Sequence, residues 1–396
     1  MDNASLSTAA LSRLDPNDAN FAVDAIELIL PMAITRGASD VHMQPRENGW
    51  EVLFRIDGVL SVAETLPGGG ASDPVTRLMV LSGLPTYRSG QPMEGRLSWS
   101  SDDPLAQKVS MRLGIYPTVH GPRAVVRLLR KDDTHDSIES LQMSSDVSDQ
   151  LSDLCAQTDG AVLLSGPTGS GKTTTMYAML RRIAGETPRR SVMTIEDPVE
   201  TVIDAISQSE LDPSSGMTLA SALRSAVRQD SEVLLVSEIR DPETAEAALQ
   251  ASLTGHLVFS SLHATDVAAS LRRLVQLGVP SYVIRSGVRA IVTQRLLRRL
   301  CERCRGESKV SGDSGCEHCL GTGYHGRIPV AQCIRLDGSD PVGEALAETL
   351  ESGRSATEMR RVAKVAGAVD LHSVAQRCVD QGITDSAEVY RVLGQW

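Results

Sequence analysis

The sequence predicts an α/β fold in which a parallel sheet covered by helices follows a smaller α+β domain. From residue 160 onward, short apolar segments alternate with helical segments, which is typical of parallel strands joined by crossover helices. Within this region the continuously apolar run Val233–Val236 indicates a strand that is buried on both faces. Residues 21–130 differ, because strand-like stretches dominate there and only two segments have a helical pattern.

Composition narrows the classes of protein that this chain can belong to. The 396 residues exceed one ordinary domain, and the 41% of hydrophobic residues is enough to build packed cores. The formal net charge of −11 gives no support to a broad nucleic-acid-binding surface. Residues 1–20 lack the layout of a signal peptide, and no run approaches the roughly 20 apolar residues that span a bilayer. We therefore expect a cytoplasmic protein that reaches a membrane only through a partner and binds no nucleic acid directly.

The predicted organisation has four parts. They are a flexible arm over residues 1–20, an α+β domain over 21–130, a polar linker over 131–150 and the α/β domain with a helical tail over 151–396. In the second part the helical segment Phe21–Gly37 contains Pro31, which is expected to kink or break it. Strands are expected at 41–44, 51–56, 59–63, 95–99, 108–116, 124–129, 161–165, 191–195, 233–237 and 257–262, and helices at 74–82 and from 172, 219 and 242.

A nucleotide site is predicted between the first strand and the first helix of the α/β domain. Residues 166–173 read Gly-Pro-Thr-Gly-Ser-Gly-Lys-Thr and fit the pattern G-x-x-x-x-G-K-[ST], whose backbone N–H groups wrap phosphates. Lys172 is expected to reach the β- and γ-phosphates of ATP, and Thr173 to ligate Mg²⁺. A chance match in a glycine-rich turn is the alternative, which the flanking strand and helix disfavour. The expected nucleotide-binding residues are Gly166, Pro167, Thr168, Gly169, Ser170, Gly171, Lys172, Thr173 and Thr174.

Acidic and imidazole side chains follow the later strands. Glu196 comes after one apolar strand and Glu238 after the next, so both are expected at the phosphates. We expect Glu238 near Mg²⁺ through water and Glu196 polarising the attacking water, although the roles can be exchanged and both can be solvated loop carboxylates. His256 and His263 flank the strand 257–262. His263 stands where it can sense the γ-phosphate, while a structural role is the alternative for both histidines.

Four of the seven cysteines form two close pairs. Cys301-x2-Cys304 and Cys316-x2-Cys319 supply four soft ligands, which suits a structural, tetrahedral Zn²⁺ in a module over residues 300–326. His318 and His325 are reserve ligands, and two disulfides or free thiols are the alternatives. The remaining cysteines, Cys155, Cys333 and Cys378, are expected to be ordinary buried thiols.

These motifs, in this order, resemble the secretion ATPase superfamily that drives type II secretion and type IV pilus assembly. The segments that carry the resemblance are Gly37–His42, Phe54–Gly58, Pro117–Gly121 with Arg123 and Val125–Arg130, Thr194–Glu200, Arg228–Glu232, Ser237–Asp241, Thr254–His256 and Leu262–His263. The resemblance runs from about Phe21 through the tail. It implies a RecA-like P-loop ATPase domain with ATP, Mg²⁺ and structural Zn²⁺ as cofactors.

The resemblance also assigns roles. It implies that Glu196, Glu238 and Lys172 act in catalysis, that His256 and His263 form a histidine box, and that three N-terminal arginines face the γ-phosphate. Those arginines are Arg96, Arg112 and Arg123, for which a salt bridge inside the small domain is the alternative. The four-cysteine module favours the assembly or secretion branch of the family. Three features are expected to depart from the family: Ser237 replaces a glycine, the loop between the cysteine pairs is short, and the chain is expected to begin near the second N-terminal domain, without an upstream docking domain.

The leading hypothesis is therefore a homo-hexameric ATPase motor that is cytoplasmic, peripheral at the inner membrane and powers type II secretion through pseudopilus assembly. Its expected partner is the inner-membrane platform protein of a secretion or pilus machine. A motor for type IV pilus assembly, DNA uptake or conjugation is the second hypothesis. A nucleotide-gated scaffold that binds ATP with little turnover is the third.

Overall fold

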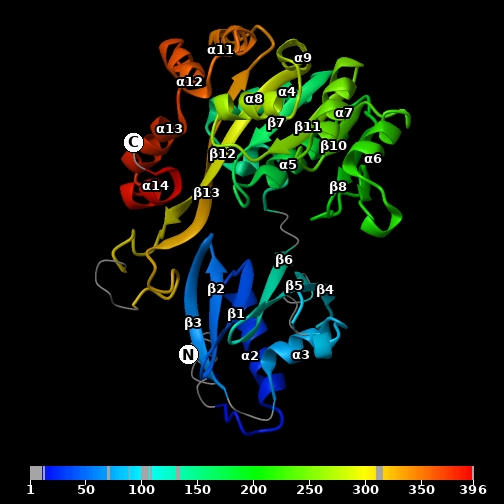
Figure 1. Cartoon of the computed structure of the whole chain (residues 1–396). Helices are drawn as coiled ribbons and strands as arrows, with labels where there is room; N and C mark the ends of the chain where they lie inside the picture. Colours follow the sequence, from blue (N-terminus) through cyan, green and yellow to red (C-terminus); the bar gives the residue numbers. More distant parts are fainter. Residues whose placement is uncertain are drawn as a thin grey trace. The chain divides into compact units, whose positions relative to one another are not determined.

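The computed structural model describes residues 11, 14–68, 72–88, 90–99, 107, 109–130, 134–308 and 315–394. The chain forms two compact units, Met1–Lys131 and Asp132–Trp396. Figure 1 shows the first unit in blue to blue-green and the second unit in the remaining colours. Each unit has its own hydrophobic core. No helix in the described part of the chain is long and apolar enough to cross a bilayer.

In the part of the first unit that the structure describes, a six-stranded sheet packs with helices α2 and α3. The strand order is β3-β2-β1-β6-β5-β4, and every neighbouring pair is antiparallel. The strands are β1 (Asp40–Arg46), β2 (Gly49–Ile56), β3 (Val59–Pro67), β4 (Met93–Leu97), β5 (Val109–Thr118) and β6 (Gly121–Arg130). The helices are α2 (Phe21–Thr35) and α3 (Pro74–Leu81), followed by the 3₁₀ turn η1 (Thr86–Arg88).

Two sequence expectations for this unit are modified by packing. Helix α2 continues through Pro31 without a break, because most of its residues are buried and tertiary packing outweighs one missing hydrogen bond. The expected arm contributes Leu11 to the core, where this side chain is fully buried, and Leu14 packs beside the same cluster. The remainder of the arm before Leu14 lies outside the described residues.

The second unit is a seven-stranded sheet covered on both faces. Its order is β13-β12-β7-β11-β10-β8-β9, and all neighbours are parallel except β12 and β13. The strands are β7 (Gly160–Ser165), β8 (Val192–Glu196), β9 (Ser207–Glu210), β10 (Val233–Val236), β11 (Leu257–Leu262), β12 (Val288–Leu300) and β13 (Tyr324–Arg335). The helices are α4 (Ser145–Cys155), α5 (Lys172–Ala184), α6 (Leu219–Ala226), α7 (Pro242–Leu253), α8 (Val267–Gln276), α9 (Ser281–Gly287), α11 (Pro341–Glu351), α12 (Ala356–Val365), α13 (Leu371–Asp380) and α14 (Ser386–Leu393), with short 3₁₀ turns η3 (Glu139–Leu141) and η4 (Pro213–Ser215).

The position of β10 between two hydrophobic clusters explains why residues 233–236 are all apolar. Val233 and Leu235 enter the cluster formed with α4 and α5, whereas Leu234 and Val236 enter the cluster on the opposite face. All four side chains are at most 1% exposed. The alternation of side chains along a strand therefore fills two cores at once, and the prediction of a parallel strand buried on both faces is confirmed.

The segment expected to be a linker is largely structured. Ile138 and Leu141 are 1% and 6% exposed and pack in the same cluster as Leu151 of α4. The surrounding residues are polar, and the only regular element here among the described residues is the 3₁₀ turn η3. This turn is too short to produce a hydrophobic period in the sequence. Of the expected linker, residues 131–133 lie outside the described part of the chain.

Strands β12 and β13, the two longest strands described in the second unit, form a hairpin. In Figure 1 its yellow and gold strands extend past the rest of the sheet to the loops that carry the cysteine pairs, and the red helices α13 and α14 lie beside it. Leu300 ends one strand directly before Cys301, and Tyr324 begins the other shortly after Cys319. The cysteine pairs therefore stand at the open end of a continuous strand pair.

Candidate active site and metal centre

The loop of residues 166–171 joins β7 to α5, and close packing fixes its glycines. Gly171 has φ +87°, and a Cβ atom on it would lie 2.7 Å from Nε2 of Gln294. A Cβ atom on Gly166 would lie 2.5 Å from Oγ of Ser170 and 2.6 Å from the carbonyl oxygen of Gln294. Only glycine fits at these two positions. The loop can therefore bring backbone N–H groups to the N-terminus of α5, which is a favourable place for an anion.

Lys172 is the first residue of α5 and is only 8% exposed. Its Nζ atom donates hydrogen bonds to the carbonyl oxygens of Gly166, at 2.8 Å, and Pro167, at 3.1 Å. Burial lowers the pKa of Lys172, and the nearby charge of Glu238 acts in the opposite direction. The ammonium group is thus held against the loop on the side from which it can reach a bound phosphate.

A pocket of about 360 Å³ lies where the parallel strands of the second unit end. Its wall combines the loop with residues that follow β8, β10 and β11, which is the edge where open parallel sheets bind ligands. The structure therefore brings together side chains that are far apart in the sequence. The polar and charged lining residues are Thr168, Lys172, Thr173, Thr174, Glu196, Asp197, Glu200, Ser237, Glu238, Arg240, Ser261, His263 and Arg327.

Glu238 follows β10 and has two charged or chargeable neighbours. Its Oε2 atom lies 2.9 Å from Nη2 of Arg240, and its Oε1 atom lies 3.0 Å from Nε2 of His263. Burial alone would raise the pKa of Glu238, but the hydrogen bond from Arg240 and the charge of His263 outweigh burial and lower it. Glu238 is therefore a carboxylate at neutral pH, which is the form that a cation or a water proton needs.

Glu196 ends β8 in a different environment. It is 2% exposed, and both carboxylate oxygens accept hydrogen bonds from neighbouring side chains. Oε1 accepts from Thr194 Oγ1 at 2.6 Å and from Gln208 Nε2 at 3.1 Å, and Oε2 accepts from the Tyr177 hydroxyl. Burial and the carboxylate of Glu196 raise the pKa of Tyr177. This network holds Glu196 in place at the pocket wall.

Three lining or supporting residues were missed by sequence reasoning. Glu200 is exposed at the pocket, and its backbone N–H lies 3.4 Å from the Tyr177 hydroxyl. It belongs to the acidic segment that sequence analysis had already singled out, so it was available as a candidate. Tyr177 is one and a half helical turns after Lys172 on α5. Gln294 had no local signal, because its contacts are with residues more than a hundred positions earlier.

Seven residues predicted for the nucleotide site do not line this pocket, namely Gly166, Pro167 and Ser170 of the loop, His256, and the three arginines of the first unit. His256 precedes β11, at the end of the strand opposite His263, and its Nδ1 atom lies 3.2 Å from the carbonyl oxygen of Ala251. Arg96, Arg112 and Arg123 lie on β4, β5 and β6 of the first unit, whereas the pocket belongs wholly to the second. Arg96 and Arg112 are cross-strand partners.

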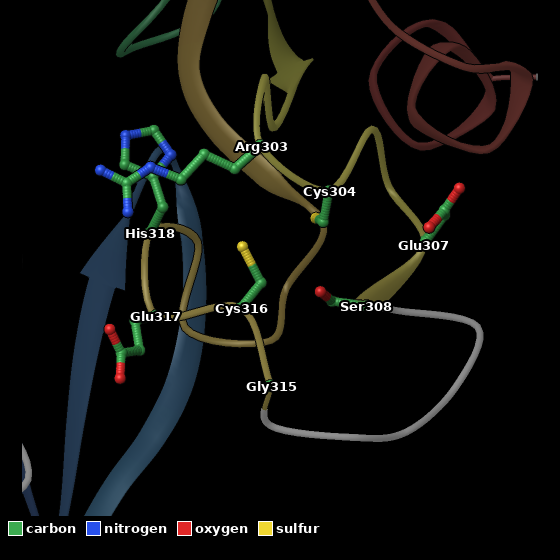
Figure 2. Close-up of a pocket in the computed structure, with 8 residues that line it drawn as sticks. All are labelled: Arg303, Cys304, Glu307, Ser308, Gly315, Cys316, Glu317 and His318. Carbon is green, nitrogen blue, oxygen red and sulfur yellow. The ribbon is translucent and has the colours of Figure 1, made fainter.

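The four predicted metal ligands form a compact cluster. The Sγ atoms of Cys301, Cys304, Cys316 and Cys319 all lie within 4.8 Å of one another, and these thiols could hold a metal ion. No disulfide joins them. Figure 2 shows Cys304 and Cys316 projecting from two turns that face each other.

The geometry of the cluster fits a zinc ion. Four Zn–S bonds in a tetrahedron place neighbouring sulfur atoms about 3.8 Å apart. The Sγ atoms of Cys301 and Cys316 are 3.8 Å apart, and those of Cys304 and Cys319 are 3.6 Å apart. The backbone N–H of Gly323 donates to the sulfur of Cys319 at 3.3 Å, a contact that stabilises a thiolate. His318 lies beside the cluster, with Nδ1 3.4 Å from the sulfur of Cys301.

The chain is similar to known proteins over nearly its whole length. Residues 15–391 match the family model described as Type II/IV secretion system protein. Type IV pilus assembly ATPase PilB of Thermus thermophilus is 36% identical over 392 residues, which cover 94% of this chain and 43% of that protein. Type II secretion system ATPase E of Vibrio cholerae is 34% identical over 397 residues, which cover 96% of this chain and 76% of that protein.

A solved structure shares the fold. The X-ray structure of the ATPase DotB of Yersinia pseudotuberculosis matches with a TM-score of 0.72 and 20% sequence identity, over 96% of this chain and 95% of that chain. The present chain spans less than half the length of the Thermus relative, so similarity to that protein covers one part of it.

Proposed function

The chain belongs to the type II/IV secretion system protein family, and from that premise we propose that it is an ATPase motor that drives type II secretion through pseudopilus assembly. The observation that carries the proposal is the pocket that gathers Lys172, Thr173, Glu238 and His263 where parallel strands end. Relatives over this region are named ATPases of secretion and pilus machines. The parallel order of the second sheet, with the loop between β7 and α5, supports a RecA-like assignment.

The residues divide the work of ATP hydrolysis between them. Loop N–H groups and the Lys172 ammonium bind the phosphates and neutralise charge on the transferring group. Thr173 and Glu238 offer the oxygen ligands that Mg²⁺ prefers. When bound, Mg²⁺ supplies Lewis-acid stabilisation of the phosphate oxygens. His263, in contact with Glu238, stands where it can respond to the γ-phosphate.

The acid that polarises the attacking water is Glu196 or Glu200. Sequence analysis assigned this role to Glu196, whose two oxygens are hydrogen-bonded to Tyr177, Thr194 and Gln208. Glu200 is exposed at the same pocket. We therefore favour Glu200 for the water and Glu196 for holding the acidic segment. The Glu200→Gln variant should then lose turnover while retaining ATP binding, and a fully active Glu200→Gln variant would return the role to Glu196.

Further members of the proposed machinery lie outside the pocket. Arg96, Arg112 and Arg123 are proposed to supply positive charge to the γ-phosphate, and His256 to act with the histidine box. Arg112→Ala should then lower kcat while leaving the Kd for ATP unchanged. The active form is proposed to be a homo-hexamer at the inner membrane, and its partner a membrane platform protein. Sedimentation with Mg²⁺ and a non-hydrolysable ATP analogue tests the ring.

The cysteine cluster is proposed to be a structural zinc site held by Cys301, Cys304, Cys316 and Cys319. Four thiolates saturate a tetrahedral ion, so no coordination position is left for a substrate. Its place at the end of the β12–β13 hairpin supports a role in shaping that end of the unit.

The experiment that tests the proposed machine is partner capture. The Glu238→Gln variant, which should retain bound ATP, is crosslinked in native membranes beside the Lys172→Ala variant, which should not bind it. Nucleotide-dependent recovery of a type II secretion platform protein with pseudopilins supports the proposal. Recovery of pilus or DNA-uptake components instead assigns the motor to the second hypothesis. The similarity to PilB is the reason to test that second hypothesis. A gel shift at moderate salt tests direct contact with DNA.

A further inference from the structure

Strand β12 runs beneath the phosphate-binding loop. Its Thr293 is paired with Ser165, the last residue of β7, so β12 continues past the point where β7 turns into the loop. The next residue, Gln294, is 2% exposed, and its side chain bridges the two ends of the segment around Lys172. Nε2 of Gln294 donates to the carbonyl oxygen of Ser170 at 2.8 Å, and Oε1 accepts from Oγ1 of Thr175 at 2.9 Å.

The chemistry of the two partners fixes the orientation of this amide. The carbonyl oxygen of Ser170 can only accept a hydrogen bond, so the NH₂ end of Gln294 must face it. The opposite end then accepts from Thr175, which is fully buried. Loss of this amide would leave the buried carbonyl oxygen of Ser170 and the hydroxyl of Thr175 without the partner that joins them, which is costly.

The loop needs such a support because its own sequence leaves it loosely determined. Gly166, Gly169 and Gly171 have positive φ values and carry no side chain that could anchor them. The amide of Gln294 also stands 2.7 Å from the place of a Cβ on Gly171, and the Leu296 side chain lies on the same face of β12, within 3.7 Å of that place. The side chains of Gln294 and Leu296 on β12 therefore restrict the path of the loop.

We propose that Gln294 is a positioning residue for nucleotide binding, which joins Ser170 of the loop to Thr175 of α5 and so fixes the loop in the shape that receives the phosphates of ATP. It acts through the loop and does not touch the nucleotide. The proposal rests on the assignment of this pocket to ATP. Preorganisation of this kind lowers the cost of binding, so its loss should appear mainly in affinity.

Two pairs of variants of the full chain test it, with a fluorescent ATP analogue and Mg²⁺ for Kd and phosphate release for kcat. Gln294→Met preserves length and removes both hydrogen bonds, and we expect the Kd to rise about tenfold or more, with a smaller change in kcat. The control is Thr293→Val on the same strand, whose buried hydroxyl has no hydrogen-bond partner among the described residues. This variant should bind ATP as the wild type does.

The Thr175 pair repeats the test from the other end of the bridge. Thr175→Ser keeps the hydroxyl and should retain wild-type affinity, whereas Thr175→Val should weaken binding and add little to Gln294→Met in the double variant. The proposal is overturned if Gln294→Met binds ATP as tightly as Thr293→Val. It is also overturned if Gln294→Met fails to fold and the two Thr175 variants bind alike. A wild-type chain that binds no ATP would instead contradict the proposed function.

Discussion

At the scale of single residues, the site depends on side chains that hold the reacting groups in place. Glu238 is set by Arg240 and His263, and Glu196 by three hydrogen-bond donors. Arg240 and Thr194 are local in the sequence, whereas His263, Tyr177 and Gln208 are more distant, and together these contacts decide which carboxylates are presented to the pocket. Supporting groups of this kind commonly matter nearly as much as the reacting groups themselves.

The hydroxyl of Tyr177 gives the first prediction. Tyr177→Phe removes the donor to Glu196 and the contact with the N–H of Glu200, so the acidic segment loses two contacts with α5. We expect kcat for ATP to fall about tenfold, because one buried hydrogen bond to a charged group is worth roughly 1.5–3 kcal/mol. Steady-state phosphate release measures it. The control Tyr282→Phe alters a side chain that is 68% exposed and should have no effect, and equal activity of the two variants would refute the prediction.

At the scale of elements, the C-terminal helices are tied to the root of the cysteine module by a buried charge. Glu388 of α14 has a fully buried side chain that accepts from the backbone N–H and the guanidinium of Arg298 on β12, at 2.7–2.9 Å, and from Arg391. The Arg298 guanidinium also lies 3.9 Å above the Tyr324 ring at the start of β13. One carboxylate thus joins both strands of the hairpin to the tail.

Loss of the Glu388 carboxylate should lower the free energy of unfolding. Burial alone would raise the pKa of Glu388, but hydrogen bonds from Arg391 and Arg298 outweigh it and lower the pKa. Glu388→Gln leaves Arg298 partly unpaired, and we expect the free energy of unfolding to fall by about 3 kcal/mol. Chemical denaturation measures it. Glu358→Gln, which alters an exposed pair with Arg361 on α12, is the control and should change stability far less.

The same carboxylate predicts a pH dependence. Since its pKa is lower in the folded chain, its stabilising contribution is complete above the ordinary pKa of a glutamate and is lost as pH falls through the folded value. The difference in stability between wild type and Glu388→Gln should therefore shrink in acid. A difference that stays constant across the acid range would contradict this assignment.

The cysteine cluster gives a prediction for the same hairpin. Cys316→Ser removes one of the four proposed ligands, so we expect the zinc content to fall from about one ion per chain to nearly none, with a lower melting temperature. Metal analysis of the purified protein measures the first effect and a thermal scan the second. Cys378→Ser, on α13 and outside the cluster, is the control and should keep the metal. Equal zinc content in both variants would show that these thiols are not the ligands.

At the scale of the whole molecule, the sequence predicted the sheet architecture better than the supports of the site. The pattern at 166–173 placed the loop between β7 and α5, and the apolar run at 233–236 placed a central parallel strand, because both signals are local. The supporting position of Gln294 could not be predicted from a local pattern, since it depends on the pairing of β12 with β7. The burial of Glu196 by Tyr177 and Gln208 likewise becomes visible only once the chain is folded.

Contacts that form only in the folded chain also explain why residues 131–150 were expected to be a linker. Ile138 and Leu141 lie in a polar stretch without a readable period, yet they fill the core under α4. Pro31 shows the opposite case, because a local rule predicted a kink or a break and packing kept α2 without a break. Local patterns therefore identified elements and motifs, whereas contacts between distant segments determined how the site is held.

The most direct test of the account is phosphate release from ATP and Mg²⁺ by the full chain, measured beside Lys172→Ala over a range of protein concentrations. The ammonium group of Lys172 is held against the loop of residues 166–171, and the variant removes it without altering the carboxylates of the pocket. We expect steady turnover by the wild type and a fall of about a hundredfold or more in the variant. Equal turnover by the two proteins, or no hydrolysis by the wild type at any concentration, would contradict it.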